Sequence, residues 1–165
     1  MTNTDGYLET LSALASADPF AVAAGTGAVI TGGIYAAFPI MVMPALDRLG
    51  LVRATKVMRA INVAAERPPF LVLFFGTAAA SAAAGTAALT VGAHDEGAGS
   101  VLLGASLAVA AFALTVLVNV PLNRRLATTN DPAGAWAPYR RCWGAANGVR
   151  AVMSIAGGVL LLTAH

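Results

Sequence analysis

The sequence predicts an all-α integral membrane protein, a four-helix bundle built as a single domain over residues 1–165. Hydrophobic residues make up 58 % of the chain and charged residues 11 %, against roughly a quarter charged in a typical soluble domain. Three runs contain no Asp, Glu, Lys, Arg or His: Pro19–Leu46, Pro68–Ala93 and Gly97–Asn123. Each exceeds the roughly 20 residues with which a helix crosses a ~30 Å hydrocarbon layer. A fourth apolar run, Ala151–Ala164, follows directly after Arg150.

These runs predict membrane-spanning helices at about 20–45, 69–92, 100–122 and 145–164. Residues 1–18 read as a polar lead-in with three acids and no base, the reverse of a signal peptide, so no cleaved signal is expected. Pro39 and Pro44 should kink or end the first span, because proline lacks a backbone donor. The single cysteine, Cys142, excludes an internal disulfide.

Small residues recur every four positions in the first two spans, a pattern that lets helix backbones approach closely in lipid. The members are Ala24, Ala28, Gly32 and Ala36 in the first span and Gly76, Ala80, Ala84 and Ala88 in the second. The pattern favours close packing within one bundle. Contact between copies in a homo-oligomer is the alternative.

A further helix is predicted between the first and second spans, at about 48–66. Its apolar face is traced by Leu51, Ala54, Met58, Ile61 and Ala65, with Arg53, Lys56 and Arg59 largely off that face. This pattern is typical of an amphipathic helix lying at the cytoplasmic membrane interface. Pro68 and Pro69 end it before the second span.

All ten basic residues fall in two segments, Arg48–Arg67 and Arg124–Arg150. The positive-inside rule therefore places both segments in the cytoplasm and both termini outside, in a multi-pass protein of the cell membrane. Contact with lipid headgroups explains most of these charges, so membrane lipid is an expected partner. Nucleic acid is not, because the chain has no separate basic domain.

Polar and aromatic residues gather near the C-terminal end. If Trp136 to Arg150 is helical, Trp136, Tyr139, Trp143, Asn147 and Arg150 share one face at steps of three, four, four and three. We call these five residues the ladder. Asn130-Asp131-Pro132 predicts the start of this helix, and Pro138 is a position at which it can break early.

Depth estimates bring the ladder close to the third span. With His165 at the outer surface, Arg150 lies about 22 Å below it, and Asn119 lies about 28 Å below Ser100. The arginine side chain can span this difference, so a polar pocket is predicted in the cytoplasmic half. It would be lined by Asn119, Asn123, Trp136, Trp143, Asn147 and Arg150. Each residue also has a simpler explanation: tryptophan as a belt anchor, asparagine as an interhelical bond, and arginine snorkelling to headgroups.

Several motifs carry a resemblance to a known family. They are VMPAL (Val42–Leu46), MRAIN (Met58–Asn62), PPF and FFGT (within Pro68–Thr77), and NVPLN (Asn119–Asn123) followed by the ladder. On these motifs the chain resembles the anthrone oxygenase family. The resemblance implies a four-helix membrane fold and oxidation of an anthrone-like aromatic substrate by O₂ with no metal or organic cofactor.

An anthrone has an acidic methylene group whose anion reacts directly with O₂. Under the resemblance, Arg150 with Asn119 and Asn147 would stabilise the oxyanion, and Trp136 and Trp143 would hold the flat rings. Asn123, Tyr139 and Asn62 would complete the substrate site.

The chemistry lacks an obvious base. Both histidines lie on the opposite side, and Asp47, Glu66 and Asp131 are the only acids on the cytoplasmic side, so one of these serves or the substrate arrives ionised. Two histidines and one cysteine make a poor set of ligands for a two-metal or haem site. Proton-coupled transport would require an acid within a span, and none of the predicted spans contains one. A non-catalytic protein that binds a lipid or quinone-like ligand, or an accessory subunit of a membrane complex, stays open.

Overall fold

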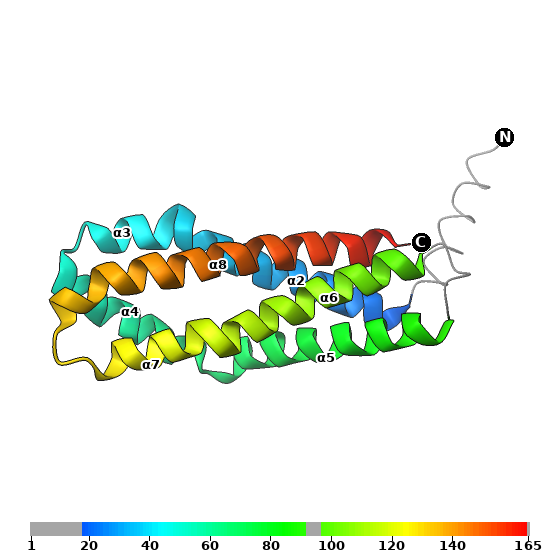
Figure 1. Cartoon of the computed structure of the whole chain (residues 1–165), viewed down its shortest axis with the longest axis horizontal. Helices are drawn as coiled ribbons and strands as arrows, with labels where there is room; N and C mark the ends of the chain where they lie inside the picture. Colours follow the sequence, from blue (N-terminus) through cyan, green and yellow to red (C-terminus); the bar gives the residue numbers. More distant parts are fainter. Residues whose placement is uncertain (1–17, 92–96, 165) are drawn as a thin grey trace.

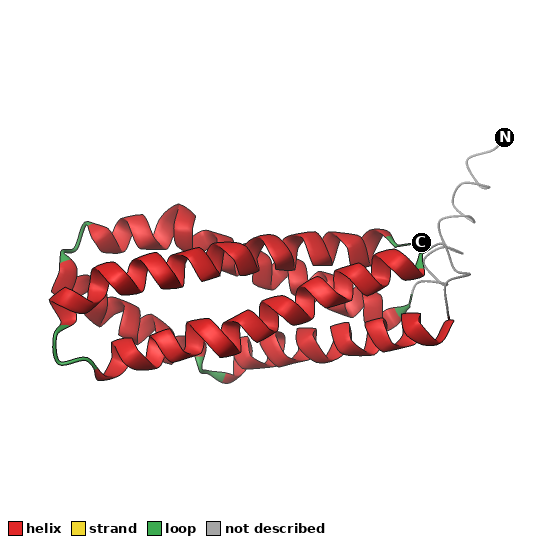
Figure 2. Ribbon diagram, in the orientation of Figure 1, coloured by secondary structure: helices red, strands yellow, loops and turns green. Residues whose placement is uncertain are grey.

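The computed structural model describes residues 18–91 and 97–164, and every regular segment within them is helical. The predicted lead-in before residue 18 and the loop around His94 lie outside the described residues. Four rods run side by side along the long axis (Figure 1). The all-α class is therefore confirmed. Figure 2 shows how short the loops between the described helices are.

The first two rods are built from several helices each. The first joins α2 (Pro19–Ala37), the π-helical segment η1 (Phe38–Val42) and α3 (Met43–Asp47) without a break. The second consists of α4 (Leu51–Ala65) and α5 (Pro68–Val91), which follow one another along the bundle (Figure 1).

The third rod joins α6 (Ala98–Leu114), the π-helical segment η2 (Thr115–Asn119) and α7 (Val120–Thr128). The fourth is the single helix α8 (Pro132–Thr163). Helix α8 packs against α2 and α6, and α5 packs against the same two helices from the other side. Each long helix thus contacts two neighbours in an up-and-down bundle.

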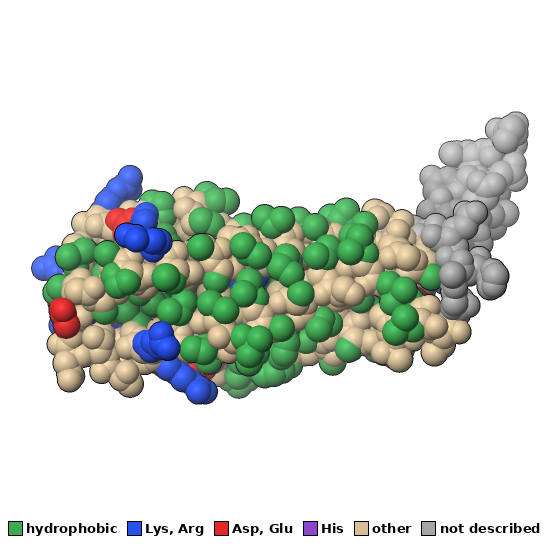
Figure 3. Space-filling model, viewed as in Figure 1, with side chains coloured by type: hydrophobic (Ala, Val, Ile, Leu, Met, Phe, Trp, Pro, Cys, Tyr) green, Lys and Arg blue, Asp and Glu red, His purple; other side chains and the backbone are tan. Residues whose placement is uncertain are grey.

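Four helices are long and apolar enough to cross a membrane, so the predicted multi-pass membrane protein is confirmed. The fourth of them has 32 residues and measures about 48 Å at ~1.5 Å per residue, more than the ~30 Å of hydrocarbon. One end of the bundle must therefore project beyond the hydrocarbon. The Lys and Arg side chains gather toward one end of the face in Figure 3, the end that carries α3, α4 and α7 in Figure 1.

Aspartate caps start the helices that frame the site. The Asp18 carboxylate accepts a hydrogen bond from the Phe20 N–H (2.9 Å), and the Asp131 carboxylate accepts one from the Gly134 N–H (2.9 Å). A proline follows each cap, where its missing N–H costs nothing. The helix start predicted at residues 130–132 is thereby confirmed.

Proline breaks the helices less than the sequence suggests. Helix α8 continues through Pro138, so the fourth membrane helix begins at Pro132, thirteen residues before the predicted 145. The first rod likewise runs through Pro39 and Pro44 to Asp47. At Pro39 the chain absorbs the lost backbone bond by widening into η1, an adjustment that membrane helices often make.

Helix α4 lies where an amphipathic helix was predicted. Its Ala54, Thr55 and Met58 are buried against α7 and α8. The Thr55 hydroxyl donates to the Pro132 carbonyl (2.8 Å), and Arg59 donates to the Leu126 and Thr129 carbonyls (2.8 and 2.9 Å). Protein contact thus accounts for much of its apolar face, and its position relative to a lipid surface stays a prediction.

Candidate functional site

The candidate site lies where the two π-helical segments face α8. A π-helical turn is rare and is often found at functional sites. In η1 the Phe38 ring lies 5.0 Å from the Trp143 ring of α8. In η2 both Thr115 and Asn119 are buried. Both segments therefore present side chains to the same stretch of α8, between Trp143 and Arg150.

Arg150 is the centre of this stretch. Its side chain is 6 % exposed, and it donates from Nε and Nη2 to the Asn147 Oδ1 atom (3.1 and 2.8 Å) and from Nη1 to the Thr115 Oγ1 atom (3.0 Å). The guanidinium carbon lies 4.0 Å from the centre of the Tyr35 ring and 5.3 Å from that of Trp143. Aromatic faces attract a cation at this distance.

No carboxylate of residues 18–91 or 97–164 forms an ion pair with Arg150. Among the described residues the single ion pair joins Arg140 and Asp47 (2.7 Å), and both of these side chains are about a third or more exposed. All four neighbours of Arg150 are formally neutral. The positive charge of the guanidinium therefore has no counter-charge among these neighbours. Such a charge within a membrane helix is costly unless an anion or water approaches it.

Two asparagine amides hold the neighbouring helices in place. The Asn147 amide donates to the Tyr35 carbonyl (2.7 Å). Pro39, four residues further along the chain, cannot donate to this carbonyl because it has no N–H. The Asn119 amide donates to the Trp143 carbonyl at a longer distance (3.4 Å). Asn147 thus links α2 to Arg150, and Asn119 links η2 to Trp143.

The other ladder residues form a second layer nearer the basic end. The Tyr139 hydroxyl donates to the Asn123 Oδ1 atom (2.9 Å) and lies beside Asn62, while the Trp136 Nε1–H donates to Asp47 (3.2 Å). Trp136 and Arg150 are 14 positions apart, which is about 21 Å along a helix. The ladder therefore forms two connected layers instead of one compact pocket.

Three aromatic residues of the ladder are packed in an apolar core. Trp136, Tyr139 and Trp143 share an apolar core whose other buried members are Met43, Leu46, Ala54, Met58 and Leu126. Their rings lie about 6 Å apart, at 6.1 Å for Trp136–Tyr139 and 6.0 Å for Tyr139–Trp143. These three aromatic side chains are therefore also a structural core of the basic end.

Three buried polar atoms around the ladder lack a hydrogen-bond partner. They are Asn62 Nδ2, Asn119 Oδ1 and Trp143 Nε1. Native proteins leave few such atoms unpaired, so this region has hydrogen-bonding capacity that the described residues do not use. Two are donors, so together with Arg150 this region offers more donors than it has acceptors.

A surface groove reaches the Arg150 layer from the side of η1 and α3. Its volume is about 260 Å³, and it is lined by Pro39, Met43, Arg140, Arg141, Trp143, Gly144, Ala145 and Asn147. We call it the arginine groove. A second hollow of about 520 Å³ adjoins it through the shared Arg140 and Arg141, and reaches Trp136 and Asp47. Its lining includes Asn147, the main hydrogen-bond partner of Arg150, but not Arg150 itself.

The sequence pattern that defines the anthrone oxygenase family matches residues 70–160, more than half of the chain. The chain belongs to the anthrone oxygenase family. The matched segment contains Asn119, Asn123 and the whole ladder, and it ends ten residues after Arg150. No curated protein and no solved structure matches the chain.

In this anthrone oxygenase family member, the structure brings the eight predicted site residues to the same part of the bundle. Arg150, Asn147, Asn119 and Trp143 form the inner layer; Tyr139, Asn123, Asn62 and Trp136 form the outer one. Asp47 lies beside the outer layer, Asp131 caps α8, and Glu66 is exposed at the end of α4. None of these acids contacts Arg150.

Sequence reasoning missed two residues of the Arg150 layer. They are Tyr35 and Thr115, neither of which is among the residues predicted from the sequence. A signal existed for Thr115, because it precedes Asn119 by four positions and so shares its helix face. For metals, the described residues contain no group of three His, Cys, Asp or Glu side chains that could hold an ion.

Proposed function

We propose that this protein oxidises a flat, acidic aromatic molecule with O₂, and that Arg150 binds the substrate as an anion. The uncompensated charge of Arg150 carries this proposal. It is buried, bonded to neutral oxygens and placed on aromatic rings. An aromatic anion would supply the missing negative charge and could stack on Trp143. Membership of the anthrone oxygenase family supports an anthrone-like substrate.

The proposed reaction converts a methylene group into a carbonyl. Loss of a proton from the CH₂ carbon leaves a carbanion whose charge spreads onto the ring oxygen. That carbon forms a C–O bond with O₂ and, after taking up a proton, becomes a hydroperoxide. Breaking its O–O bond and losing the remaining C–H proton releases water and leaves C=O. Overall, R₂CH₂ and O₂ give R₂C=O and H₂O, so the substrate is oxidised and O₂ is reduced.

The residues of the site would stabilise the negative charge of the substrate and would not themselves react with O₂. Arg150 and the amides of Asn147 and Asn119 would stabilise the oxyanion, because donors fixed in a site of low dielectric favour developing charge. Asp47, Glu66 and Asp131 do not contact Arg150, so we propose that the substrate arrives ionised or loses its proton at Asp47 in the outer layer. The reaction written here requires no metal or organic cofactor.

The arginine groove supports the proposal as a route to this site. Its walls combine two cationic side chains, Arg140 and Arg141, with the aromatic Trp143. This lining complements a flat anion, and it includes Asn147, the residue that holds Arg150. Such a route would let the substrate pass from the membrane interface to the inner layer.

A non-catalytic role is the second candidate, as a protein that binds a lipid or quinone-like ligand or as an accessory subunit. The packing of the ladder favours it, because Trp136, Tyr139 and Trp143 already share a filled apolar core. On this alternative Arg150 would bind a lipid phosphate or only stabilise the bundle.

Replacing Arg150 tests the proposal. Arg150→Met should lower the oxidation of an anthrone by about 10²–10³-fold, the usual loss when one oxyanion donor is removed. Arg150→Lys keeps the charge without the planar fork and should reduce turnover less. The readouts are O₂ uptake and quinone absorbance in detergent.

Arg124→Met, which removes an exposed cation of α7, is the matched control and should leave turnover unchanged. Full activity in a folded Arg150→Met, or activity that disappears with a chelator, would contradict the mechanism. The purified protein should contain no stoichiometric iron or copper.

We also propose that the basic end faces the cytoplasm. In a Cys142→Ser background, Asp5→Cys and Glu96→Cys should react with an impermeant maleimide added to intact cells, and Lys56→Cys should not. Lys56 lies on the exposed face of α4, whereas its neighbour Thr55 is fully buried and unsuitable for labelling. The opposite labelling pattern would reverse the orientation.

A further inference from the structure

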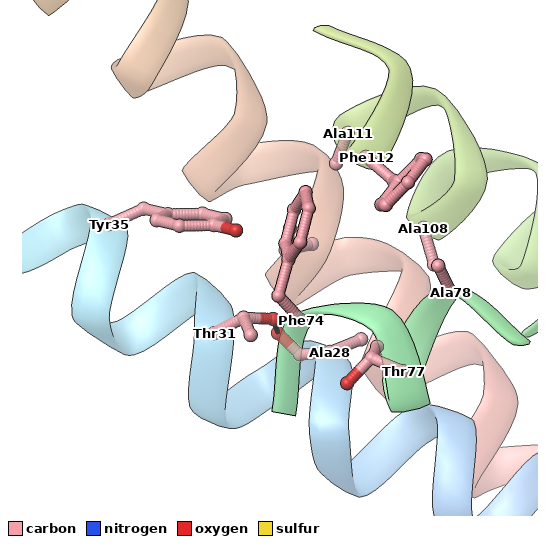
Figure 4. Close-up of a pocket in the computed structure, with 10 residues that line it drawn as sticks. Ala28, Thr31, Tyr35, Phe74, Thr77, Ala78, Ala108, Ala111 and Phe112 are labelled. Carbon is pink, nitrogen blue, oxygen red and sulfur yellow. Dashed lines mark hydrogen bonds between the residues drawn. The ribbon is translucent and has the colours of Figure 1, made fainter. Parts of the chain in front are cut away.

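A second internal site lies beside the Arg150 layer and plays no part in the proposed reaction. It is a cavity of about 10 Å³ between α2, α5, α6 and α8. Figure 4 shows its side chains converging from α2, α5 and α6. The lining combines Phe74, Phe112 and four alanines with four hydroxyl groups, those of Thr31, Tyr35, Thr77 and Ser154.

The Thr77 hydroxyl is the unusual member. Its oxygen is buried and has no hydrogen-bond partner. The other hydroxyls of α5 behave differently: Ser81 and Thr86 donate to carbonyls four residues back in their own helix, at 2.8 Å each. This ordinary local bond is available to a helical threonine. The Thr77 oxygen instead lies against Gly27 of α2, where a side-chain carbon would collide with it, and its donor is free for another partner.

Ser154 lines the cavity from the opposite side, on α8. It is 3 % exposed, and its hydroxyl makes no hydrogen bond to any described residue. Thr31 donates to the Gly27 and Ala28 carbonyls (2.8 and 3.0 Å), which leaves its oxygen free to accept. The cavity thus offers donors from α5 and α8 and an acceptor from α2.

We propose that this cavity binds one water molecule. The volume matches one water, for which roughly 10–15 Å³ suffices, and a buried water typically makes about three hydrogen bonds. Here it would accept from Thr77 and Ser154 and donate to Thr31 or Tyr35. Dioxygen would fit the space but cannot satisfy these hydroxyls, so the polar lining favours water.

The bound water links three helices and supports the Arg150 layer. It joins α2, α5 and α8 at a depth where lipid offers no hydrogen bonds. Tyr35 belongs to both places, because it lines the cavity and its ring lies 4.0 Å from the Arg150 guanidinium. The water is therefore a structural ligand that supports the Tyr35 side of the Arg150 layer, whatever reaction the site performs.

X-ray radiolysis with mass spectrometry tests this site, because a bound water generates hydroxyl radicals that label adjacent side chains. Phe74 and Phe112 line the cavity, so both should be labelled in the wild type. Their labelling should fall several-fold in Ser154→Ala. Absence of label on both rings, or xenon binding in the cavity of a crystal, would overturn the assignment, since xenon prefers dry apolar cavities.

Stability provides an independent readout. Ser154→Ala removes a partner of the water and should raise the unfolding equilibrium constant by roughly fivefold to tenfold. Ser81→Ala is the matched control, because this fully buried serine bonds only to its own helix and should have little effect. If Ser154→Ala is no less stable than Ser81→Ala, the cavity is dry and the proposal fails.

Discussion

The two halves of the bundle are held together in different ways. Away from the basic end the helices meet through small residues: a side-chain carbon on Gly157 would lie 2.7 Å from the Gly104 carbonyl oxygen, so the two backbones touch. At the basic end the helices meet through aromatic rings and the Arg150 network instead. Lipid provides no hydrophobic drive between helices, so close packing and interhelical polar bonds are the available means. This bundle uses one in each half.

The boundary between the halves is marked by η1 and η2. On the side away from the basic end, the helices are regular and closely spaced. At η1 and η2 the helical turn widens, and large side chains lie between the helices, such as Phe38 against Trp143. Stability therefore depends on both halves, whereas binding is expected to depend on the polar half alone. Changes in the small-residue half should affect folding alone. Changes in the Arg150 network should affect folding and binding together, and changes at the surface of the arginine groove should affect binding.

The largest stability effect is expected at Asn147. Asn147→Leu removes two hydrogen bonds from Arg150 and one to the Tyr35 carbonyl. Hydrogen bonds to charged groups contribute about 1.5–3 kcal/mol each, so the two bonds from Arg150 alone predict a fall of at least about 3 kcal/mol in the free energy of unfolding. Denaturant titration in detergent measures it.

Asn123→Leu serves as a graded control for this change. It removes one neutral bond, from the Tyr139 hydroxyl, and should cost about 1 kcal/mol. Equal losses at Asn147 and Asn123 would mean that the charge of Arg150 adds nothing to the polar half.

The next effect should come from the small-residue half. Gly157→Ala forces a methyl group against the Gly104 carbonyl and should cost about 1–3 kcal/mol, the usual range for overpacking. Gly148→Ala on the same helix meets no atom within 4 Å and should be neutral or slightly stabilising, since alanine favours helix. Both variants should bind an aromatic anion as the wild type does. Loss of binding in Gly157→Ala would show that the halves are coupled.

The sequence predicted the helices of the small-residue half and the polar half in outline. Charge-free runs depend only on local composition, so the helices follow from them. The close packing was predicted only in part: Gly76 of the second predicted stripe is exposed with no neighbour, and the close contact at Gly157 lies in a helix for which no stripe was predicted. The face shared by Trp136 and Arg150 was also visible, because an α-helix has a fixed period. The family motif at Asn119–Asn123 indicated that the third span also contributes polar residues to the site.

What the sequence could not supply depends on contacts between helices. The π-helical turns at Phe38 and Thr115 arise where proline and packing combine, and no residue type encodes them alone. Tyr35 became a neighbour of Arg150 only because α2 and α8 cross at that height. The start of α8 was predicted at residues 130–132, but its membrane span was predicted only from residue 145, because the uninterrupted apolar run begins after Arg150.

A smaller effect, on binding alone, should follow from filling the arginine groove. Gly144 lines it and has open space where a side chain would begin, so Gly144→Leu narrows the groove without a clash. Binding of anthraquinone-2-carboxylate should weaken about fivefold, or roughly 1 kcal/mol, with the unfolding midpoint unchanged. The two tryptophans of the chain line the groove and its neighbour, so quenching of their fluorescence reports binding without turnover.

Gly148→Leu is the matched control for the groove, one turn further along α8 and outside its lining. Unchanged binding in Gly144→Leu, or an equal loss in Gly148→Leu, would remove the groove as the route. The probe is already oxidised, so this result is independent of whether the protein catalyses the proposed reaction.

The smallest effect is expected at the edge of the polar half, from Asp47→Asn. The pair between Asp47 and Arg140 is partly exposed, and such pairs contribute about 0–1 kcal/mol, so stability should change by less than about 0.5 kcal/mol. The amide oxygen still accepts from Trp136, so the ring keeps its place. Arg140 loses its counter-charge, and the carboxylate probe should bind about twofold tighter in low salt, an advantage that screening removes in 0.5 M salt. The variant also tests the missing base: if Asp47→Asn abolishes oxidation while probe binding persists, Asp47 removes the substrate proton. If oxidation continues, the substrate reaches Arg150 already ionised.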